Sequence, residues 1–261
     1  MTCPKLDLHI HTKYLRCANE TMEVADIVRE CERLGVIALG ITDHLNEPGQ
    51  IDLHGTIRED IERLDTELAV WFGVELNFVE CDGGFVYSED IRERIGFQFA
   101  IGGIHATYLR EYDLPRLVEI QHRHHLKTCA DPLVDVVVHP YWFGKGDFNR
   151  NAWPWFDSMK AVPEAFAREL GQAARDTGTA VEINACANLV NPAYSRQYVE
   201  EYYEYLSIIA EEGAMFAVGS DAHSIEQLAS IETAWDMADR LGLDEGRIWR
   251  PTCKPMVGAE S

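Results

Sequence analysis

Short apolar runs alternate along the chain with longer segments in which apolar residues recur every three or four positions. The short runs are rich in β-branched and aromatic residues and are bounded by Gly, Asp or Pro, which is typical of buried strands. They predict seven strands, at residues 5–10, 36–42, 70–76, 97–104, 134–138, 179–183 and 215–219.

The longer segments have the spacing of amphipathic helices. The first follows Thr21, which we predict to be its N-cap, and is closed by Gly35. Comparable patterns cover residues 58–68, 114–125, 163–176, 195–212 and 225–241. Apolar strands alternating with helices imply a parallel sheet covered by helices. With seven strands and no linker or internal repeat, we predict an α/β protein whose sheet forms a closed or nearly closed barrel, a single domain over residues 1–261.

The amino-acid composition limits the binding partners and the cellular compartment that we expect for this protein. The chain has 44 acidic and 23 basic residues and a net charge of −21, which opposes binding to nucleic acid or to anionic membranes. Its seven cysteines are scattered and never spaced as CxxC, which favours a reducing compartment. The N-terminus has no apolar secretory segment, and no apolar run is long enough to span a membrane. We therefore expect a cytoplasmic protein that acts on a small molecule.

Histidine and acidic residues gather where the predicted strands end. They are His9 and His11, Asp43 and His44, Glu75, His105, His139, Glu182, and Asp221 and His223. One such residue alone is usually structural, but the carboxyl ends of barrel strands all meet at one end, where barrel enzymes have their active sites. Imidazole and carboxylate groups bind Zn, Mn or Fe, and one carboxylate can bridge two metals. The set predicts a polynuclear metal centre.

The HxH pair is the strongest local signal. His9 and His11 are two residues apart on a predicted strand, so alternation directs both imidazoles to the same face. We expect both to point into the mouth of the barrel and to hold one metal.

The sequence resembles the polymerase-and-histidinol-phosphatase (PHP) family of metal-dependent phosphoesterases. The resemblance rests on DLHIHT, GITDH, GVELNF, FAIGGIHAT, VVVHP, VEIN and GSDAH, which follow the order of the family from Asp7 to His223. It implies a distorted seven-stranded (β/α)7 barrel that binds two or three divalent metal ions.

The resemblance also implies a ligand set for each metal. The first metal would be held by His9, His11, Glu75 and Asp221. The second would share Glu75 and would also be held by His105 and His139. The third would be held by His44, His223 and a residue of the loop after the first strand. Asp43 and Glu182 would orient ligands or substrate.

The sequence departs from the family pattern in two places. Cys17 stands where related phosphatases have the last histidine ligand of the third metal. Its thiolate can bind zinc; otherwise Asn19 or Glu20 reaches the metal, the third site is weak or empty, or Cys17 is a simple loop residue. In addition, Leu189 occupies the place of a phosphate-binding arginine, with Arg196 displaced nearby, which disfavours histidinol phosphate as substrate.

Other features have both a functional and a structural interpretation. The candidate phosphate-binding cations are Lys13, Arg16, Lys145, Arg150 and Arg196, and each is otherwise a solvated loop charge. The aromatic residues at 141–143 and 153–156 either line a substrate pocket or pack a long loop on the barrel. His122, His124 and His125 lie on a predicted outer helix, where we expect a structural role.

The resulting hypothesis is metal-dependent hydrolysis of a small-molecule phosphate ester, either a monoester or a diester. A metal-bridging hydroxide would be the nucleophile, and Asp221 and His223 would be catalytic residues, with Asp221 transferring a proton. Two alternatives stay open: a metallohydrolase acting on a C–N or C–O bond, and a non-catalytic metal-binding accessory domain.

Overall fold

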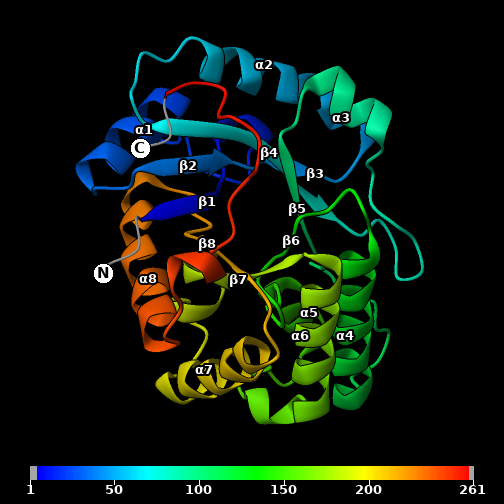
Figure 1. Cartoon of the computed structure of the whole chain (residues 1–261). Coiled ribbons are helices and arrows are strands. Elements are labelled where there is room, and N and C mark those ends of the chain that lie inside the picture. Colours follow the sequence, from blue (N-terminus) through cyan, green and yellow to red (C-terminus); the bar gives the residue numbers. More distant parts are fainter. Residues whose placement is uncertain (1–4, 259–261) are drawn as a thin grey trace.

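Seven parallel strands surround the centre of the molecule in the order β1-β2-β4-β5-β6-β7-β8, and the short strand β3 pairs with β4 (Figure 1). The computed structural model describes residues 5–258. Its strands are β1 (Leu6–Ile10), β2 (Ala38–Ile41), β3 (His44–Leu45), β4 (Ala69–Asn77), β5 (Phe99–Gly103), β6 (Val136–Val137), β7 (Ala180–Asn184) and β8 (Phe216–Gly219). The predicted seven-stranded α/β barrel is thereby confirmed.

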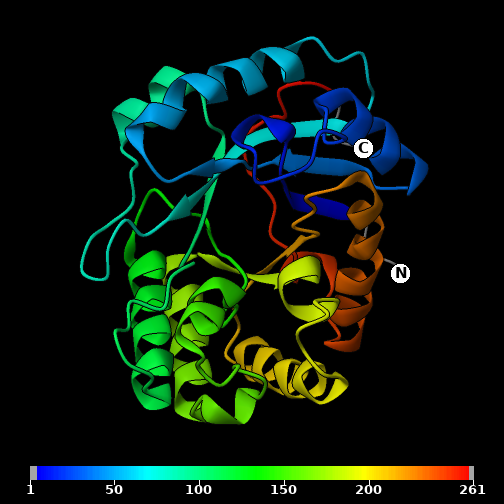
Figure 2. The same ribbon diagram turned by 180° about the vertical axis from the view of Figure 1, so that it is seen from behind.

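Helices cover the outside of the barrel, as Figures 1 and 2 show from opposite sides. They are α1 (Val24–Arg33), α2 (Ile51–Glu62), α3 (Glu89–Ile95), α4 (Leu114–Ala130), α5 (Lys145–Asn151), α6 (Glu164–Thr177), α7 (Arg196–Glu211) and α8 (Ile231–Arg240). Among residues 5–258, none of them has both the length and the apolar character needed to cross a membrane.

The barrel closes where the last strand meets the first. The backbone N–H of Asp221, just after β8, donates to the carbonyl of His9 at 2.7 Å. The N–H of His11 donates to the carbonyl of Ala222 at 3.3 Å. These bonds leave the sheet nearly without free edges.

Phe99 fills part of the barrel interior. A Cβ atom placed on Gly40 of β2 or on Gly73 of β4 would lie 2.6 Å from the Phe99 ring. The ring therefore occupies space that two glycines on neighbouring strands leave open. Phe99 is the first residue of β5 and its ring lies 5.8 Å from that of Trp249, so this packing fills the barrel toward the amino ends of the strands.

Two helix boundaries differ from the prediction. Helix α1 begins at Val24 with Glu23 at the N-cap, not Thr21. The Thr21 hydroxyl instead accepts a hydrogen bond from the backbone of Ile225 at 3.3 Å. The predicted helix 225–241 is divided into a 3₁₀ segment (Ile225–Ser230) and α8.

A third difference concerns α2, which starts at Ile51 and ends at Glu62, whereas the pattern placed it at residues 58–68. Gly55 lies inside this helix, and glycine disfavours helix in a sequence-based prediction. A 3₁₀ turn (Pro48–Gln50) directly before α2 has a capping box, which fixes the start of the helix.

The C-terminal segment, residues 249–257, crosses the opposite end of the barrel and is drawn in red in Figure 1. The N–H of Trp249 donates to the carbonyl of Phe216 in β8 at 2.8 Å. The N–H of Val70 in β4 donates to the carbonyl of Val257 at 3.1 Å. The segment thus covers the amino ends of strands and leaves their carboxyl ends open.

Candidate metal centre

The predicted ligand side chains converge at the carboxyl ends of the strands, on the side of the loops that face the viewer in Figure 2. Three groups have ligand atoms within 4.8 Å of one another: His9, His11 and Asp221; His44, Glu75 and His105; and His11, Cys17, His44 and His223. Each group combines residues from different strands or loops, so the folded barrel alone brings them together.

Glu75, at 1% exposure on β4, is the centre of the arrangement. Its Oε1 lies 3.0 Å from Nε2 of His105 and 3.0 Å from Nε2 of His139. Its Oε2 lies 2.8 Å from Nδ1 of His44 and 3.3 Å from Nε2 of His11. The two oxygens of one carboxylate therefore face different sets of imidazoles, as a metal-bridging carboxylate requires.

The HxH pair meets Asp221 beside this carboxylate. The Nε2 atoms of His9 and His11 are 3.0 Å apart, so both rings point to one place. Oδ1 of Asp221 lies 3.5 Å from Nε2 of His9 and 3.2 Å from Nε2 of His11. A bulge in β1 between Asp7 and Ile10 breaks the simple alternation, but both imidazoles still face the barrel mouth.

Cys17 lies at the exposed edge of the centre, beside His11, His44 and His223. Its Sγ is 3.9 Å from Nδ1 of His11. Burial raises the pKa of the Cys17 thiol to about 12, so it would lose its proton only on binding a metal. The Asn19 carboxamide, an alternative ligand, accepts a hydrogen bond from Thr21 instead.

Glu182 and Asn184 on β7 support the ligands. Oε1 of Glu182 lies 2.6 Å from Nδ1 of His9, and its Oε2 accepts the backbone N–H of His139 at 2.8 Å. The Asn184 amide donates to Glu182 at 3.0 Å and to Asp221 at 3.2 Å. Glu182 occupies the orienting position expected for it. Asn184 was missed, although its place two residues further on the same strand was a usable signal.

Two further side chains bind the backbone around the ligands. The fully buried carboxylate of Asp43 accepts the N–H of Thr12 at 3.1 Å, and burial raises the pKa of Asp43 to about 7. Nε2 of His54 lies 2.9 Å from the carbonyl oxygen of His44, which makes His54 a structural support.

The carboxylates of the centre are held ionised. Burial by itself would raise the pKa of Glu75, but the charges of His44, His105 and His9 hold it well below its usual range. For Asp221 as well, burial opposes ionisation, and His9 is the main group that keeps the pKa below its ordinary value. Anionic oxygens are the form in which carboxylates bind metals.

Several imidazoles are held neutral. Burial lowers the pKa of His11 to about 3, and burial also lowers the pKa of His105. A neutral imidazole has a lone pair available for a metal. His9 and His44 behave in the opposite way: against the effect of burial, Glu182 raises the pKa of His9 and Glu75 raises the pKa of His44. Metal binding would therefore release a proton from these two imidazoles.

Unpartnered polar atoms give an independent test of fit. Nδ1 of His44 and Oε2 of Glu75 are buried and have no hydrogen-bond partner, although they are 2.8 Å apart. Buried polar atoms without partners are costly, unless they bind something else. Both atoms belong to the clustered ligand set, so the residues fit a divalent metal centre.

Lys13 lies in a 3₁₀ turn directly followed by Arg16, Lys145 and Arg150 lie in the first and last turns of α5, and Arg196 begins α7. Lys13 ion-pairs with Glu23, and Arg150 ion-pairs with Asp147. Lys145 lies 5.9 Å from the ring centroid of Trp155. Arg16 and Arg196 are exposed. Binding of phosphate by these cations stays a prediction.

The aromatic residues of the loop after β6 differ in their surroundings. Tyr141, Phe143 and Phe156 are buried and pack the loop on the barrel. Trp142 instead lies beside two ligands, with ring centroids 5.5 Å from His105 and 5.2 Å from His139.

The histidines of α4 lie outside the three ligand groups. His122 stacks on Phe166 with centroids 3.9 Å apart, and Nδ1 of His124 lies 2.7 Å from the carbonyl oxygen of Ile120. His125 is fully buried against Tyr141. These positions agree with the structural role expected for them.

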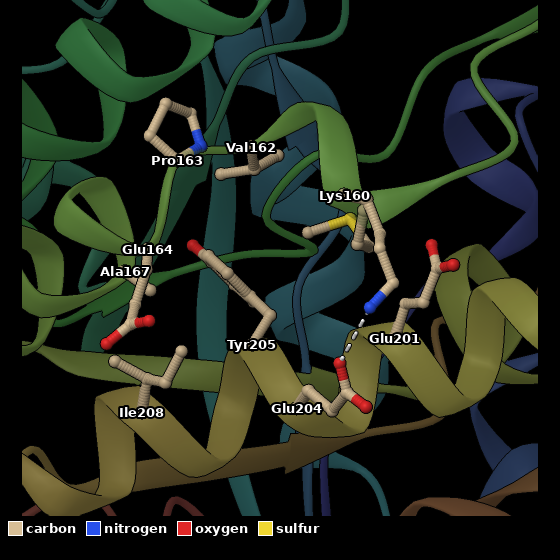
Figure 3. Close-up of a pocket in the computed structure, with 10 residues that line it drawn as sticks. Lys160, Val162, Pro163, Glu164, Ala167, Glu201, Glu204, Tyr205 and Ile208 are labelled. Carbon is tan, nitrogen blue, oxygen red and sulfur yellow. Dashed lines mark ion pairs between the residues drawn. The ribbon is translucent and has the colours of Figure 1, made fainter.

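A separate cavity of about 220 Å³ lies between the turn at Met159–Ala161, α6 and α7 (Figure 3). Its charged side chains already have partners: Glu204 pairs with Lys160 at 3.5 Å, and Glu201 accepts from Ser158 at 2.6 Å. The cavity contains none of the clustered ligand residues, so the barrel mouth is the candidate site.

The barrel and its cluster of imidazoles and carboxylates define a metal-binding α/β barrel. The chain belongs to the PHP domain family, whose model matches residues 7–186. It is 24% identical over 238 residues to DNA polymerase/3'-5' exonuclease PolX of Bacillus subtilis (strain 168), covering 88% of this chain but 36% of that protein. It is also 24% identical over 248 residues to a probable phosphatase of Thermoanaerobacter sp. (strain X514), covering 94% of this chain and 90% of that protein.

Among solved structures, dihydropteroate synthase from Thermus thermophilus aligns with a TM-score of 0.41 and 16% identity. The alignment covers 93% of this chain and 85% of that one. This likeness is too distant to bear on the chemistry of the site.

Proposed function

We propose that this chain is a metal-dependent phosphoesterase that hydrolyses a small-molecule phosphate ester. Membership of the PHP family and the likeness to a probable phosphatase over almost its whole length support a phosphoesterase-type function. The observation that carries the proposal is Glu75, whose two oxygens lie 3.0 Å from His105 and 2.8 Å from His44. Such a carboxylate is suited to holding two metals side by side.

Two divalent ions fit the most buried part of the cluster. His9, His11 and Asp221 would hold one ion and His105 and His139 the other, and Glu75 would bind both. Bound there, the ions would supply Lewis-acid activation of water and neutralise charge on the phosphoryl group.

Asp221 is the proposed proton carrier. Its Oδ2 is fixed by Asn184 at 3.2 Å, and its Oδ1 faces the HxH pair. The backbone of Asp221 is in the left-handed region with φ of 54°, which costs energy and is tolerated where a side chain must be aimed. Held ionised, Asp221 can accept a proton from water and pass it to the leaving group.

His223 is proposed as the second catalytic residue, at the open edge of the site. Its Nδ1 lies 3.0 Å from the carbonyl oxygen of Asp221, so Nδ1 carries the proton and donates it there. The neutral ring then leaves Nε2 free to bind a metal or to accept a proton.

We propose that His44, Cys17 and His223 hold a third ion. A site containing a thiolate favours zinc over manganese, because soft sulfur ligands bind zinc well. The third ion would therefore differ in preference from the two ions around Glu75, which have nitrogen and oxygen ligands alone.

For the phosphate group we propose Arg16, Lys145 and Arg196 as the cations open to substrate. Lys13 and Arg150 are candidates of lower rank, because each is ion-paired in the present structure. The net charge of −21 makes a nucleic-acid substrate unfavourable, so we propose no nuclease activity.

The test is chelator-sensitive phosphate release by protein loaded separately with Mn and Zn, on sugar phosphates, nucleoside monophosphates, and diesters coupled to a phosphatase. His105→Ala and Asp221→Ala should each lower turnover by about two orders of magnitude or more while the fold is retained. His122→Ala, which removes an imidazole outside the cluster, is the matched control and should keep its activity.

If protein with two or more bound metals releases phosphate from none of these esters, the proposal is overturned. That result would point to hydrolysis of a C–N or C–O bond. Leu189, buried at 8% exposure where related phosphatases have an arginine, is the residue that would favour that outcome. Binding of fewer than two metals would point instead to a non-catalytic metal-binding domain.

A further inference from the structure

Trp142 is more exposed than four other aromatic residues of the loop after β6. Tyr141 and Phe143 on either side are 0% and 2% exposed, and Phe148 and Phe156 are each 2% exposed. Trp142 is partly exposed. One part of its ring packs on the core, and the remainder is accessible to solvent.

The position of Trp142 ties it to the second ligand group. Its ring lies 5.5 Å from His105 and 5.2 Å from His139, at interplanar angles of 71° and 59°. Both imidazoles have Nε2 3.0 Å from Oε1 of Glu75. The indole therefore forms one wall of the place where a phosphoryl group would bind.

The backbone holds the indole there at a cost. His139 and Tyr141 are both in the left-handed region, with φ of 29° and 58°, which non-glycine residues seldom adopt. The N–H of Trp142 donates to the carbonyl of His139 at 3.0 Å and closes this turn. The backbone conformation of the turn that carries Trp142 is thus held by a hydrogen bond within the turn.

The indole N–H of Trp142 also differs from that of two other tryptophans in its hydrogen bonding. The N–H groups of Trp71 and Trp235 donate to the carbonyls of Cys253 at 3.0 Å and Leu6 at 2.9 Å. Within the part of the chain that the structure describes, no hydrogen bond engages the indole N–H of Trp142. Both the ring and its donor are available to a ligand.

We propose that Trp142 binds the leaving group of the substrate, and that this group contains an aromatic or heteroaromatic ring. The inference rests on the proposed phosphoesterase function, and it names the substrate class of the same site. A planar ring stacks on an indole with more affinity than a saturated ring of similar size.

A cationic leaving group is the other chemistry that an indole binds. The position of the ring argues against it. A cation at Trp142 would lie next to divalent ions held by His105 and His139, and like charges repel strongly where water is excluded. A neutral ring has no such penalty.

The experiment compares four esters that all have a primary alkoxide as leaving group: 2-phenylethyl, 2-cyclohexylethyl, ethyl and 2-aminoethyl phosphate. They are hydrolysed by metal-loaded protein, and kcat/KM is measured for each. We expect the phenylethyl ester to be preferred over the cyclohexylethyl and ethyl esters by roughly 5- to 100-fold.

Trp142→Ala should abolish that preference, because its kcat/KM should fall much more for the phenylethyl ester than for ethyl phosphate. Trp142→Phe should restore part of it. Trp153→Ala is the matched control, because Trp153 is a partly exposed aromatic residue of the same loop that packs on Phe148 and Tyr112. That variant should keep the wild-type preference.

A second measurement does not depend on turnover. Binding of 2-phenylethylphosphonate and ethylphosphonate, followed by calorimetry, should show the same preference in wild type and its loss in Trp142→Ala. If no ester is hydrolysed but this preference is found, the proposed function fails and the role of Trp142 stands. Equal binding of the two phosphonates overturns the role of Trp142.

Two further results would overturn the inference even if hydrolysis is confirmed. A Trp142→Ala variant that loses the same factor for all four esters would show that the indole only supports His105 and His139. A preference for the 2-aminoethyl ester that disappears in Trp142→Ala would show that the site selects a cation.

Discussion

Cys17 is the one candidate ligand of the proposed third site that offers sulfur in place of nitrogen or oxygen. Its Sγ lies 3.9 Å from Nδ1 of His11 and within 4.8 Å of a ring nitrogen of His44 and of His223. If the proposed third site exists, a thiolate there would change the metal preference of that site and leave the neighbouring sites, made of nitrogen and oxygen ligands, unaffected.

Cobalt substitution tests this directly, because thiolate ligation gives an intense near-ultraviolet charge-transfer band. We expect the band in wild type and its loss in Cys17→Ser, together with about one equivalent of metal per chain. Cys17→His should keep the metal without the band. Cys253→Ser, at another exposed cysteine, is the control; a band that survives in Cys17→Ser would refute the ligand assignment.

His125 offers a second test at the residue scale, this time of stability. Its imidazole is fully buried on α4, neither ring nitrogen has a hydrogen-bond partner, and burial holds its pKa well below the ordinary value. The unfolded chain therefore binds a proton near pH 6.5 that the folded chain does not bind. The free energy of unfolding should fall as pH decreases below about 6.5, by up to about 1.4 kcal/mol per pH unit for this residue.

His125→Leu should reduce that slope by about one proton in metal-free protein, measured by denaturant unfolding between pH 5 and 7. Gln121→Leu is the comparison, because Gln121 is a buried polar residue of the same helix without a titratable group. It should change stability without changing the slope. An unchanged slope in His125→Leu would show that the imidazole is protonated in the folded state.

At the scale of elements, Gly219 at the end of β8 leaves the space that the side chains of His9 and Glu182 occupy. A Cβ on Gly219 would lie 2.5 Å from Cβ of His9 and 2.6 Å from Oε1 of Glu182. Gly219→Ala should displace the His9–Glu182 pair and weaken metal binding by about 10- to 100-fold, as expected when a supporting contact of a ligand is lost.

Gly171→Ala provides the comparison for Gly219→Ala. A Cβ on Gly171 of α6 would lie 2.8 Å from Cβ of Glu212, far from any ligand residue in the sequence and on an outer helix. Titration of both variants with zinc should show weaker binding in Gly219→Ala alone. Equal affinity in the two variants would mean that the strand adjusts to the added carbon.

Among the elements, the strands were predicted well from the sequence and the start of α2 was predicted poorly. The seven strands and the ligand residues at their ends follow from local patterns, because a buried strand has apolar residues on both faces and stops at a polar one. The start of α2 was wrong, because Gly55 lowers the local helix propensity and the capping box at Glu47 was not recognised.

Within the site, the features that the sequence did not predict depend on contacts between segments that are far apart in the chain. Asn184 binds Asp221 across two strands, and no local pattern indicates which amide will reach which carboxylate. The ion pairs that occupy Lys13 and Arg150, and the exposure of Trp142, likewise follow from the folded loops. The assignments of metal ligands and of catalytic residues stay predictions until metal binding and turnover are measured.

At the scale of the whole molecule, the barrel concentrates carboxylates and imidazoles in a buried place. Metals that bind the folded chain alone stabilise it by mass action, by about 4 kcal/mol for each ion present at about 1,000 times its Kd. For a chain of 261 residues this corresponds to a rise in Tm of roughly 10 °C per ion.

Removal of metal by a chelator should therefore lower Tm, and addition of Zn or Mn should restore it. Glu75→Gln should show a much smaller difference between the two states, because a carboxamide cannot bridge two ions. Glu201→Gln, which changes a buried carboxylate on α7 outside the cluster, should respond like wild type. Equal Tm values with and without metal in wild type would contradict a tightly bound centre.

The seam between β8 and β1 has a consequence for the time at which metal can enter. His9 lies on the first strand and Asp221 directly after the last, and the N–H of Asp221 binds the carbonyl of His9. On a ribosome that adds about 5–20 residues per second, the HxH pair would wait roughly 10 to 40 s for its carboxylate partner. Metal loading therefore follows barrel closure, and the rate at which a refolding chain acquires metal should report when its two ends have met.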